Sequence, residues 1–182
     1  MKLNINFLID PSATMLPFLS KLGSNMNHLI DALKTLSYDQ INLSLYMPKE
    51  ENKCLEIYNS QMFNLNENLF GLAKEISTIN TKKEFDDEDI IDFINMYYEQ
   101  TDFKNNINII TILFTNKKLE ICDLEIIKNI EEDNGLVFIV SSACLDSMHE
   151  KLYLFNKDVS FIDDLEIKEL LLEIVSAITF SQ

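Results

Sequence analysis

Apolar residues along the chain form two kinds of segment, short β-branched runs and longer stretches with helical spacing. Leu3 to Ile9, Ile107 to Phe114 and Leu136 to Val140 are almost continuously apolar, which is typical of strands covered on both faces. Ile41 to Met47 instead alternates apolar and polar positions, and a short connection leads to a further strand, Cys54 to Tyr58. These two segments predict an antiparallel hairpin.

Helical spacing fills most of the chain between these runs. A long helix is expected to carry one apolar stripe, in steps of three and four residues, formed by Met15, Leu19, Leu22, Met26, Leu29, Leu33 and Leu36. Further helices are expected at 69–76, from Asp86 to Tyr97, at 124–130, at 145–155 and at 167–178, with a short last strand at Val159 to Ile162. Strands alternating with helices predict an α/β fold: three α/β/α layers, and a mostly parallel sheet with one antiparallel edge strand.

Length and charge narrow the class of protein. The 182 residues suit a single domain, 1–182. The formal net charge is -15, from 30 acidic and 15 basic residues, and all the basic residues are lysines. This charge argues against binding to nucleic acid or to an anionic membrane surface, and it favours a bound cation or a basic partner.

Two residue types exclude several enzyme classes. Only Gly23, Gly71 and Gly135 are present, so neither glycine-rich phosphate-binding motif can form. His28 lies on a polar helical face and is expected to be solvated, and His149 has no nucleophile motif to serve.

An odd number of scattered cysteines (Cys54, Cys122 and Cys144) predicts free thiols in a reducing compartment. The apolar run near the N-terminus is too short for a signal peptide, so a cytoplasmic location is expected.

The strongest local signal is Asp10-Pro11-Ser12-Ala13-Thr14, between the first strand and the long helix. In open α/β sheets, ligands bind beyond the carboxyl ends of the strands, where Asn116 also follows an apolar strand. One carboxylate and two hydroxyls at i, i+2 and i+4 make an oxygen pocket suited to Mg²⁺. The alternative is purely structural: the segment turns the chain, and Thr14 caps the helix.

The order of elements and the segments FLIDPSATM, ITILFTN and FIDDLEIKELLLEIVSAI resemble the von Willebrand factor A (VWA) domain, over essentially the whole chain. The resemblance is to small stand-alone bacterial members, including those of tellurite-resistance and stress operons. It implies a Rossmann-like fold and a non-enzymatic module that binds another protein, encoded nearby. It also implies a metal-ion-dependent adhesion site (MIDAS), at which Mg²⁺ docks an acidic group of the partner.

The residues that match the family's metal site are Asp10, Ser12 and Thr14, with Glu88 and Asn116 in the two later positions. Ala13 replaces the usual glycine of the first motif. Asn116 replaces the usual aspartate, which removes one carboxylate, and Glu88 stands where the family has a threonine. The resemblance therefore implies a partly degenerate metal site, with Glu88 offsetting the charge lost at Asn116.

Two other functions are compatible with the same sequence. In a haloacid-dehalogenase-like phosphatase, Asp10 would be the nucleophile, with Thr115, a lysine (Lys117 or Lys128) and the pair Asp163-Asp164 completing the site. Against it, Ser12 occupies the place of the usual general acid. In a scaffold subunit, the fold would serve assembly without any ligand. Aromatic residues for such a surface are Tyr97, Tyr98 and Tyr153, although half-buried helical positions are the expectation for them.

Overall fold

The computed structural model describes residues 2–48, 55–60, 87–104, 108–117, 128–130, 132, 135–141, 152–156 and 162–180. The elements follow the chain in the order β1 (Lys2–Ile9), the 3-10 helix η1 (Ala13–Met15), α1 (Leu16–Leu33), β2 (Gln40–Pro48), β3 (Leu55–Ser60), α3 (Asp87–Gln100), β4 (Ile109–Phe114), β5 (Leu136–Ser141), β6 (Leu152–Asn156) and α5 (Asp164–Phe180).

The strands form one sheet in the order β3-β2-β1-β4-β5-β6. The pairs β2–β1, β1–β4, β4–β5 and β5–β6 are parallel, and β3 runs antiparallel to β2. The α/β class predicted from the alternation of segments is therefore confirmed. β1 and β4 are central neighbours, so the segments that follow them meet at one edge of the sheet.

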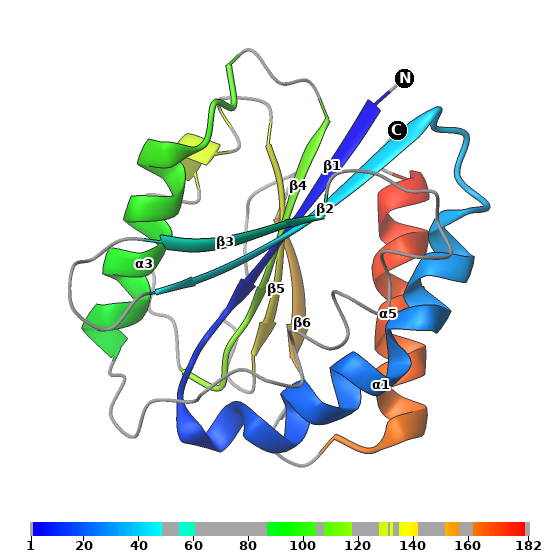
Figure 1. Cartoon of the computed structure of the whole chain (residues 1–182), viewed down its shortest axis with the longest axis horizontal. Helices are drawn as coiled ribbons and strands as arrows, with labels where there is room; N and C mark the ends of the chain where they lie inside the picture. Colours follow the sequence, from blue (N-terminus) through cyan, green and yellow to red (C-terminus); the bar gives the residue numbers. More distant parts are fainter. Residues whose placement is uncertain are drawn as a thin grey trace.

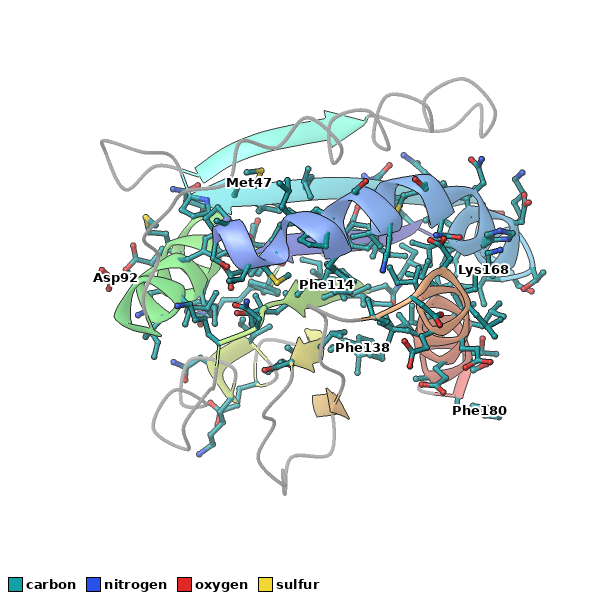
Figure 2. The ribbon with its side chains drawn as sticks, turned by 90° about the horizontal axis from the view of Figure 1, so that it is seen from below. Met47, Asp92, Phe114, Phe138, Lys168 and Phe180 are labelled. Atoms are coloured by element: carbon teal, nitrogen blue, oxygen red, sulfur yellow. The ribbon has the colours of Figure 1, made fainter. Side chains whose placement is uncertain are left out.

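Helices cover both faces of this sheet (Figure 1). Figure 2 views the sheet from its end: α3, with Asp92, lies on one side, and α5, with Lys168 and Phe180, lies on the other. α1 packs against α5 on that second side. The predicted stripe of α1 is confirmed, because Met15, Leu19, Leu22, Met26, Leu29 and Leu33 are all buried there and Leu36 packs partly against them.

Strand alternation divides the core in two. Every second residue of β1 and of β4 faces α1 and α5, and the residues between them face α3. On the first side, the ring of Phe114 stacks on Phe7 at 6.2 Å and contacts Phe18 of α1 at 5.1 Å, between ring centroids. These contacts fix the start of α1 against the carboxyl ends of β1 and β4.

On the α3 side, three buried polar side chains form hydrogen bonds with one another inside the core. Asn6 and Thr111 are paired residues of β1 and β4. The Asn6 amide donates to the Tyr97 hydroxyl at 2.8 Å, and that hydroxyl lies 2.7 Å from the Thr111 hydroxyl. Tyr97 is fully buried, rather than half-buried as expected from its helical position, and burial raises its pKa. Tyr98 is half-buried, as expected.

Replacing Tyr97 by Phe should lower the free energy of unfolding by about 1–3 kcal/mol, because Asn6 and Thr111 lose a buried partner. The replacement should also change the alkaline response. Above about pH 10 the unfolded tyrosine ionises while the buried one stays neutral, so wild-type stability falls as the pH rises. Urea unfolding between about pH 8 and 11 tests this. Parallel losses in wild type and Tyr97→Phe would contradict it.

The last helix begins with a reciprocal cap. The Asp163 carboxylate accepts hydrogen bonds from the backbone amides of Leu165 and Glu166, at 2.8 and 2.9 Å, and Glu166 accepts one from the Asp163 amide at 2.8 Å. The Lys21 ammonium of α1 donates to the carbonyl of Ile162, just before this cap. The cap and the α1 contact together set where α5 crosses the sheet.

Three features of the fold differ from the sequence prediction. Leu152 and Phe155 belong to strand β6, not to a fifth helix, and Ile162 lies outside any strand. The 3-4 spacing that suggested the helix competes with the continuous apolar run Leu-Tyr-Leu-Phe, which pairs with β5. β4 begins at Ile109 rather than at Ile107, because Asn108 takes a left-handed conformation (φ 67°).

Several predictions fall outside the described residues. They include the helix at 69–76, most of the helix at 124–130, the turn after β2, and the free thiols of Cys54, Cys122 and Cys144. His149 is also outside, whereas His28 is exposed as expected. None of the described helices is both long enough and apolar enough to cross a bilayer.

Candidate functional site

Two chain segments meet where the central strands end. The Asp10 amide donates to the carbonyl of Phe114 at 3.1 Å, and the Thr115 amide donates to the carbonyl of Val140 at 3.1 Å. The parallel ladders thus continue one residue past β1 and past β4. This places Asp10 beside Thr115 and Asn116, as the sheet topology required.

The Asp10 carboxylate is fully buried and holds both segments. Its Oδ1 accepts a hydrogen bond from the Ser12 backbone amide at 2.8 Å, and its Oδ2 accepts one from the Thr115 hydroxyl at 2.7 Å. Thr115 Oγ1 in turn accepts from the Lys117 amide at 3.0 Å. The Asp10 carboxylate therefore links the loop after β1 to the loop after β4.

Around this carboxylate, three oxygen-bearing side chains converge. Ser12 Oγ lies 3.1 Å from Thr14 Oγ1 and donates to Asn116 Oδ1 at 3.4 Å. The Asn116 amide nitrogen donates to Thr14 Oγ1. Ser12 is buried, whereas Thr14 is exposed and Asn116 is partly exposed, so the cluster opens to solvent on the Thr14 side.

The start of α1 does not follow the purely structural alternative, in which Thr14 caps the helix. A 3-10 turn over Ala13–Met15 precedes α1, and the residue that caps α1 is Met15. Thr14 therefore is not the N-cap of this helix. Its hydroxyl is directed instead at Ser12 and Asn116. Ser12 has an extended backbone (φ -62°, ψ 148°) and makes no side-chain cap, so both hydroxyls belong to the polar cluster.

The spacing of these oxygens suits a small hard cation. Two neighbouring ligands of octahedral Mg²⁺, each about 2.1 Å from the ion, lie about 3.0 Å apart. Ser12 Oγ and Thr14 Oγ1 are 3.1 Å apart, and Asn116 Oδ1 lies 3.4 Å from Ser12 Oγ. The donor set is mostly neutral, because Asp10 is its one carboxylate among the described side chains. In the part of the chain that the structure describes, no group of three or more His, Cys, Asp or Glu side chains is placed so that it could hold a metal ion.

The remaining predicted ligand is Glu88. It belongs to the first turn of α3 (Asp87–Gln100). The sequence predicted a helix start in this acidic run. In Figure 1, α3 begins toward the end of the sheet where β1 and β4 end. A role for Glu88 as a ligand stays a prediction.

Sequence reasoning missed two supporting residues of this site. Thr115, considered only for the phosphatase, is fully buried and donates to Asp10 across 105 positions of sequence. Ser141, at the end of β5, donates to the carbonyl of Lys117 at 2.7 Å and so holds the loop after β4. A hydroxyl residue directly at or after the end of each buried strand is the signal that could have indicated both.

The same contacts weigh against Asp10 as a nucleophile. Both of its oxygens accept hydrogen bonds and the residue has no exposed surface, so a phosphate group has no approach to it. Asp163 of the supposed acidic pair caps α5, and Asp164 accepts a hydrogen bond from Asn25 of α1 at 3.3 Å. Both aspartates of the pair therefore have structural roles at the start of α5.

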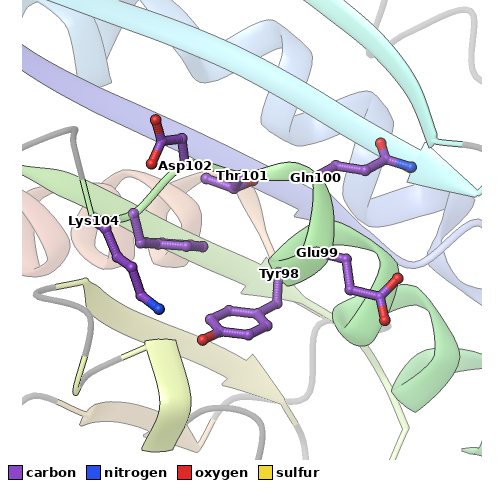
Figure 3. A pocket seen from close by; sticks show the side chains of 7 residues that line it. Tyr98, Glu99, Gln100, Thr101, Asp102 and Lys104 are labelled. Atoms are coloured by element: carbon purple, nitrogen blue, oxygen red, sulfur yellow. The ribbon is translucent and has the colours of Figure 1, made fainter.

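A separate hollow of about 380 Å³ lies at the other end of α3 (Figure 3). Residues 98–104 line it, with Tyr98 stacked on Phe103 at 5.8 Å between ring centroids. It is open and formed by one continuous segment, and none of the oxygen cluster contributes to it. The hollow is therefore distinct from the candidate metal site.

Comparison with known proteins shows the fold. Neither a protein-family model nor a curated protein matches the chain. Among solved structures, the SpRpn10 VWA domain is 11% identical with a TM-score of 0.58, covering 96% of this chain and 94% of that domain. The pilus adhesin SpaC from Lactobacillus rhamnosus GG (8% identical, TM-score 0.64) and proximal thread matrix protein 1 from the mussel byssus (12%, 0.61) each match 97% of this chain.

The chain spans only 30% of the adhesin and 46% of the byssus protein, so it corresponds to one part of each. These likenesses show a VWA-like fold, as the sequence resemblance implied. At such low identity they establish the arrangement of strands and helices and leave the chemistry of the site to its own residues.

Proposed function

We propose that this chain is a non-enzymatic protein-binding module that docks an acidic group of a partner protein through Mg²⁺ at the carboxyl edge of its sheet. The ligands are Ser12, Thr14 and Asn116, with Asp10 behind them and Glu88 as a further ligand. The observation that supports this most is the convergence of the three side-chain oxygens, with Ser12 Oγ and Thr14 Oγ1 3.1 Å apart. The adhesin and VWA domains of similar fold are consistent with it.

The charge of the cluster indicates how such a module would work. Among the described side chains of the cluster only Asp10 is a carboxylate, so a divalent ion there keeps a net positive charge that Glu88 and a carboxylate of the partner can share. Bound Mg²⁺ supplies a Lewis acid that accepts an anionic oxygen. The net charge of -15 otherwise repels acidic surfaces, so the ion makes one acidic contact favourable at this position alone. We infer that the module binds metal weakly by itself and more tightly together with its partner, which we expect to be encoded nearby.

Thermal unfolding with added MgCl₂ tests the metal site. With a dissociation constant of about 1 mM, about 10 mM Mg²⁺ should stabilise the protein by about 1.4 kcal/mol, or roughly 3–5 °C in Tm. Ser12→Ala should abolish this shift, because it removes the oxygen that contacts both Thr14 Oγ1 and Asn116 Oδ1. Ser24→Ala is the matched control, since the Ser24 hydroxyl only bonds within α1.

An unchanged Tm in wild type, or an equal shift in Ser12→Ala, would contradict the metal site and leave metal-free protein binding. A phosphatase assay with p-nitrophenyl phosphate and Mg²⁺ tests the enzyme alternative. We expect no turnover, and turnover that Asp10→Asn abolishes would overturn the proposal.

A further inference from the structure

The outward face of α5 exposes large apolar side chains. Leu165, Leu172 and Phe180 are 64%, 52% and 88% exposed, and the one other described large hydrophobic residue of this kind is Leu16, at the start of α1. At about 100° per residue, Leu165 and Leu172 lie about 20° apart around the helix, and Phe180 lies about 60° from Leu165. Leu165, Leu172 and Phe180 therefore form one surface, the α5 stripe (Figure 2 shows Phe180 on the outer side of the helix).

Acidic residues lie beside the two leucines of the α5 stripe, on the side toward Phe180. Glu169, about 40° around the helix from Leu165, lies between Leu165 and Phe180 in angle, and Glu173, at about 80°, lies just past Phe180; both are exposed. Lys168 lies about 60° away on the opposite side. The inner face is already filled, since Ile167, Leu170, Leu171, Ile174 and Ile178 pack into the core. The stripe is therefore additional apolar surface, and Glu169 and Glu173 form an acidic edge beside its two leucines.

Three kinds of occupant can be compared by charge. A second copy of this chain would bring another net charge of -15 and the same acidic edge against the first. An anionic lipid surface would be repelled for the same reason. A helix with its own apolar stripe and a row of Lys or Arg would bury the leucines and place its cations against Glu169 and Glu173.

We propose that the α5 stripe is a docking surface for a basic amphipathic helix of a partner protein. The surface is separate from the metal cluster and shares none of its residues, so it stands independently of the proposed function. It would let one module hold a basic segment on α5 and an acidic group at the carboxyl edge of the sheet.

Fluorescence anisotropy with a labelled Leu/Lys peptide tests this. The probe is a designed helix with leucine at i, i+3 or i+4 and i+7 and lysine elsewhere, and two comparison peptides carry glutamate for lysine or a scrambled order. We expect Leu172→Ser to weaken binding about tenfold or more, because it removes a leucine from the centre of the contact. Glu173→Lys should weaken it by a similar factor. Leu16→Ser and Glu99→Lys are the matched controls on α1 and α3, each expected to change the affinity less than about twofold.

Equal weakening by the control variants, or equal binding of the scrambled peptide, would show attraction to net charge alone and overturn the proposal. Binding of the glutamate peptide as tight as that of the lysine peptide would overturn it as well. Sedimentation that shows self-association lost in Leu172→Ser, without peptide binding, would assign the stripe to a second copy. None of these results depends on Mg²⁺, so failure here is distinguishable from failure of the metal site.

Discussion

Asn116→Asp is expected to bind Mg²⁺ about 10 to 100 times more tightly than wild type. The change places a carboxylate where the amide oxygen now lies 3.4 Å from Ser12 Oγ. A unit charge pair at about 4 Å is worth about 4 kcal/mol at an effective dielectric of about 20, and desolvation and salt reduce that gain. A net gain of about 1.4–2.8 kcal/mol corresponds to the expected range.

The same variant should be less stable than wild type in EDTA. The new carboxylate lies in the cluster beside Asp10, and Thr14 loses the donor that the Asn116 amide supplies. Added Mg²⁺ should restore its Tm, so the variant should show the larger metal-dependent shift. Isothermal titration and thermal unfolding measure the two effects.

Asn27→Asp is the matched control, because Asn27 is exposed on α1 and the change adds the same charge away from the cluster. It should leave Mg²⁺ affinity within about twofold of wild type. If Asn27→Asp gained as much as Asn116→Asp, the effect would be a general attraction of cations to an acidic protein. No gain in Asn116→Asp would show that the cluster does not hold the ion.

Asp10→Ala is expected to lower the free energy of unfolding by about 3 kcal/mol, in EDTA. The change leaves the Ser12 amide and the Thr115 hydroxyl without their acceptor, and each buried donor left unpaired costs about 1–3 kcal/mol. Because these two bonds join the loops after β1 and β4, the loss should also disorder the cluster and remove Mg²⁺ binding. Urea unfolding gives the free energy.

Asp163→Ala is the comparison for this loss. Asp163 also accepts two backbone hydrogen bonds, but it is an exposed helix cap. Its removal should cost about 1 kcal/mol, the usual value for a lost N-cap. A loss in Asp10→Ala no larger than that in Asp163→Ala would mean that Asp10 does not join the two loops as described.

The parts of the fold with strong periodicity could be predicted from the sequence. The stripe of α1 and the buried inner face of α5 each show one helical period, and β1, β4 and β5 are continuous apolar runs; the structure confirms all five. The prediction of a helix at 145–155 was wrong over β6, because the residues of β6 fit both a helical spacing and a continuous apolar run. Pairing with β5 decides between the two, and no local sequence pattern indicates that pairing.

The candidate site could be predicted only in part. Asp10, Ser12, Thr14 and Asn116 were indicated by their positions after strands, and the parallel topology brings them together. The Thr115 contact with Asp10 and the Tyr97 contact with Asn6 join residues far apart in sequence, and spacing does not reveal such contacts. The helix start was misjudged at Thr14 because a 3-10 turn and an α-helix begin with the same residue types.

The proposed metal site holds a divalent cation among Ser12, Thr14 and Asn116. The most direct measurement is paramagnetic broadening of backbone amide resonances by substoichiometric Mn²⁺, competed with Mg²⁺. We expect the amides of residues 10, 12–14 and 115–117 to broaden first and Mg²⁺ to restore them, while the amides of residues 165–180 stay sharp. Broadening that spreads evenly over the acidic surface, or that spares residues 10–14, would contradict the account.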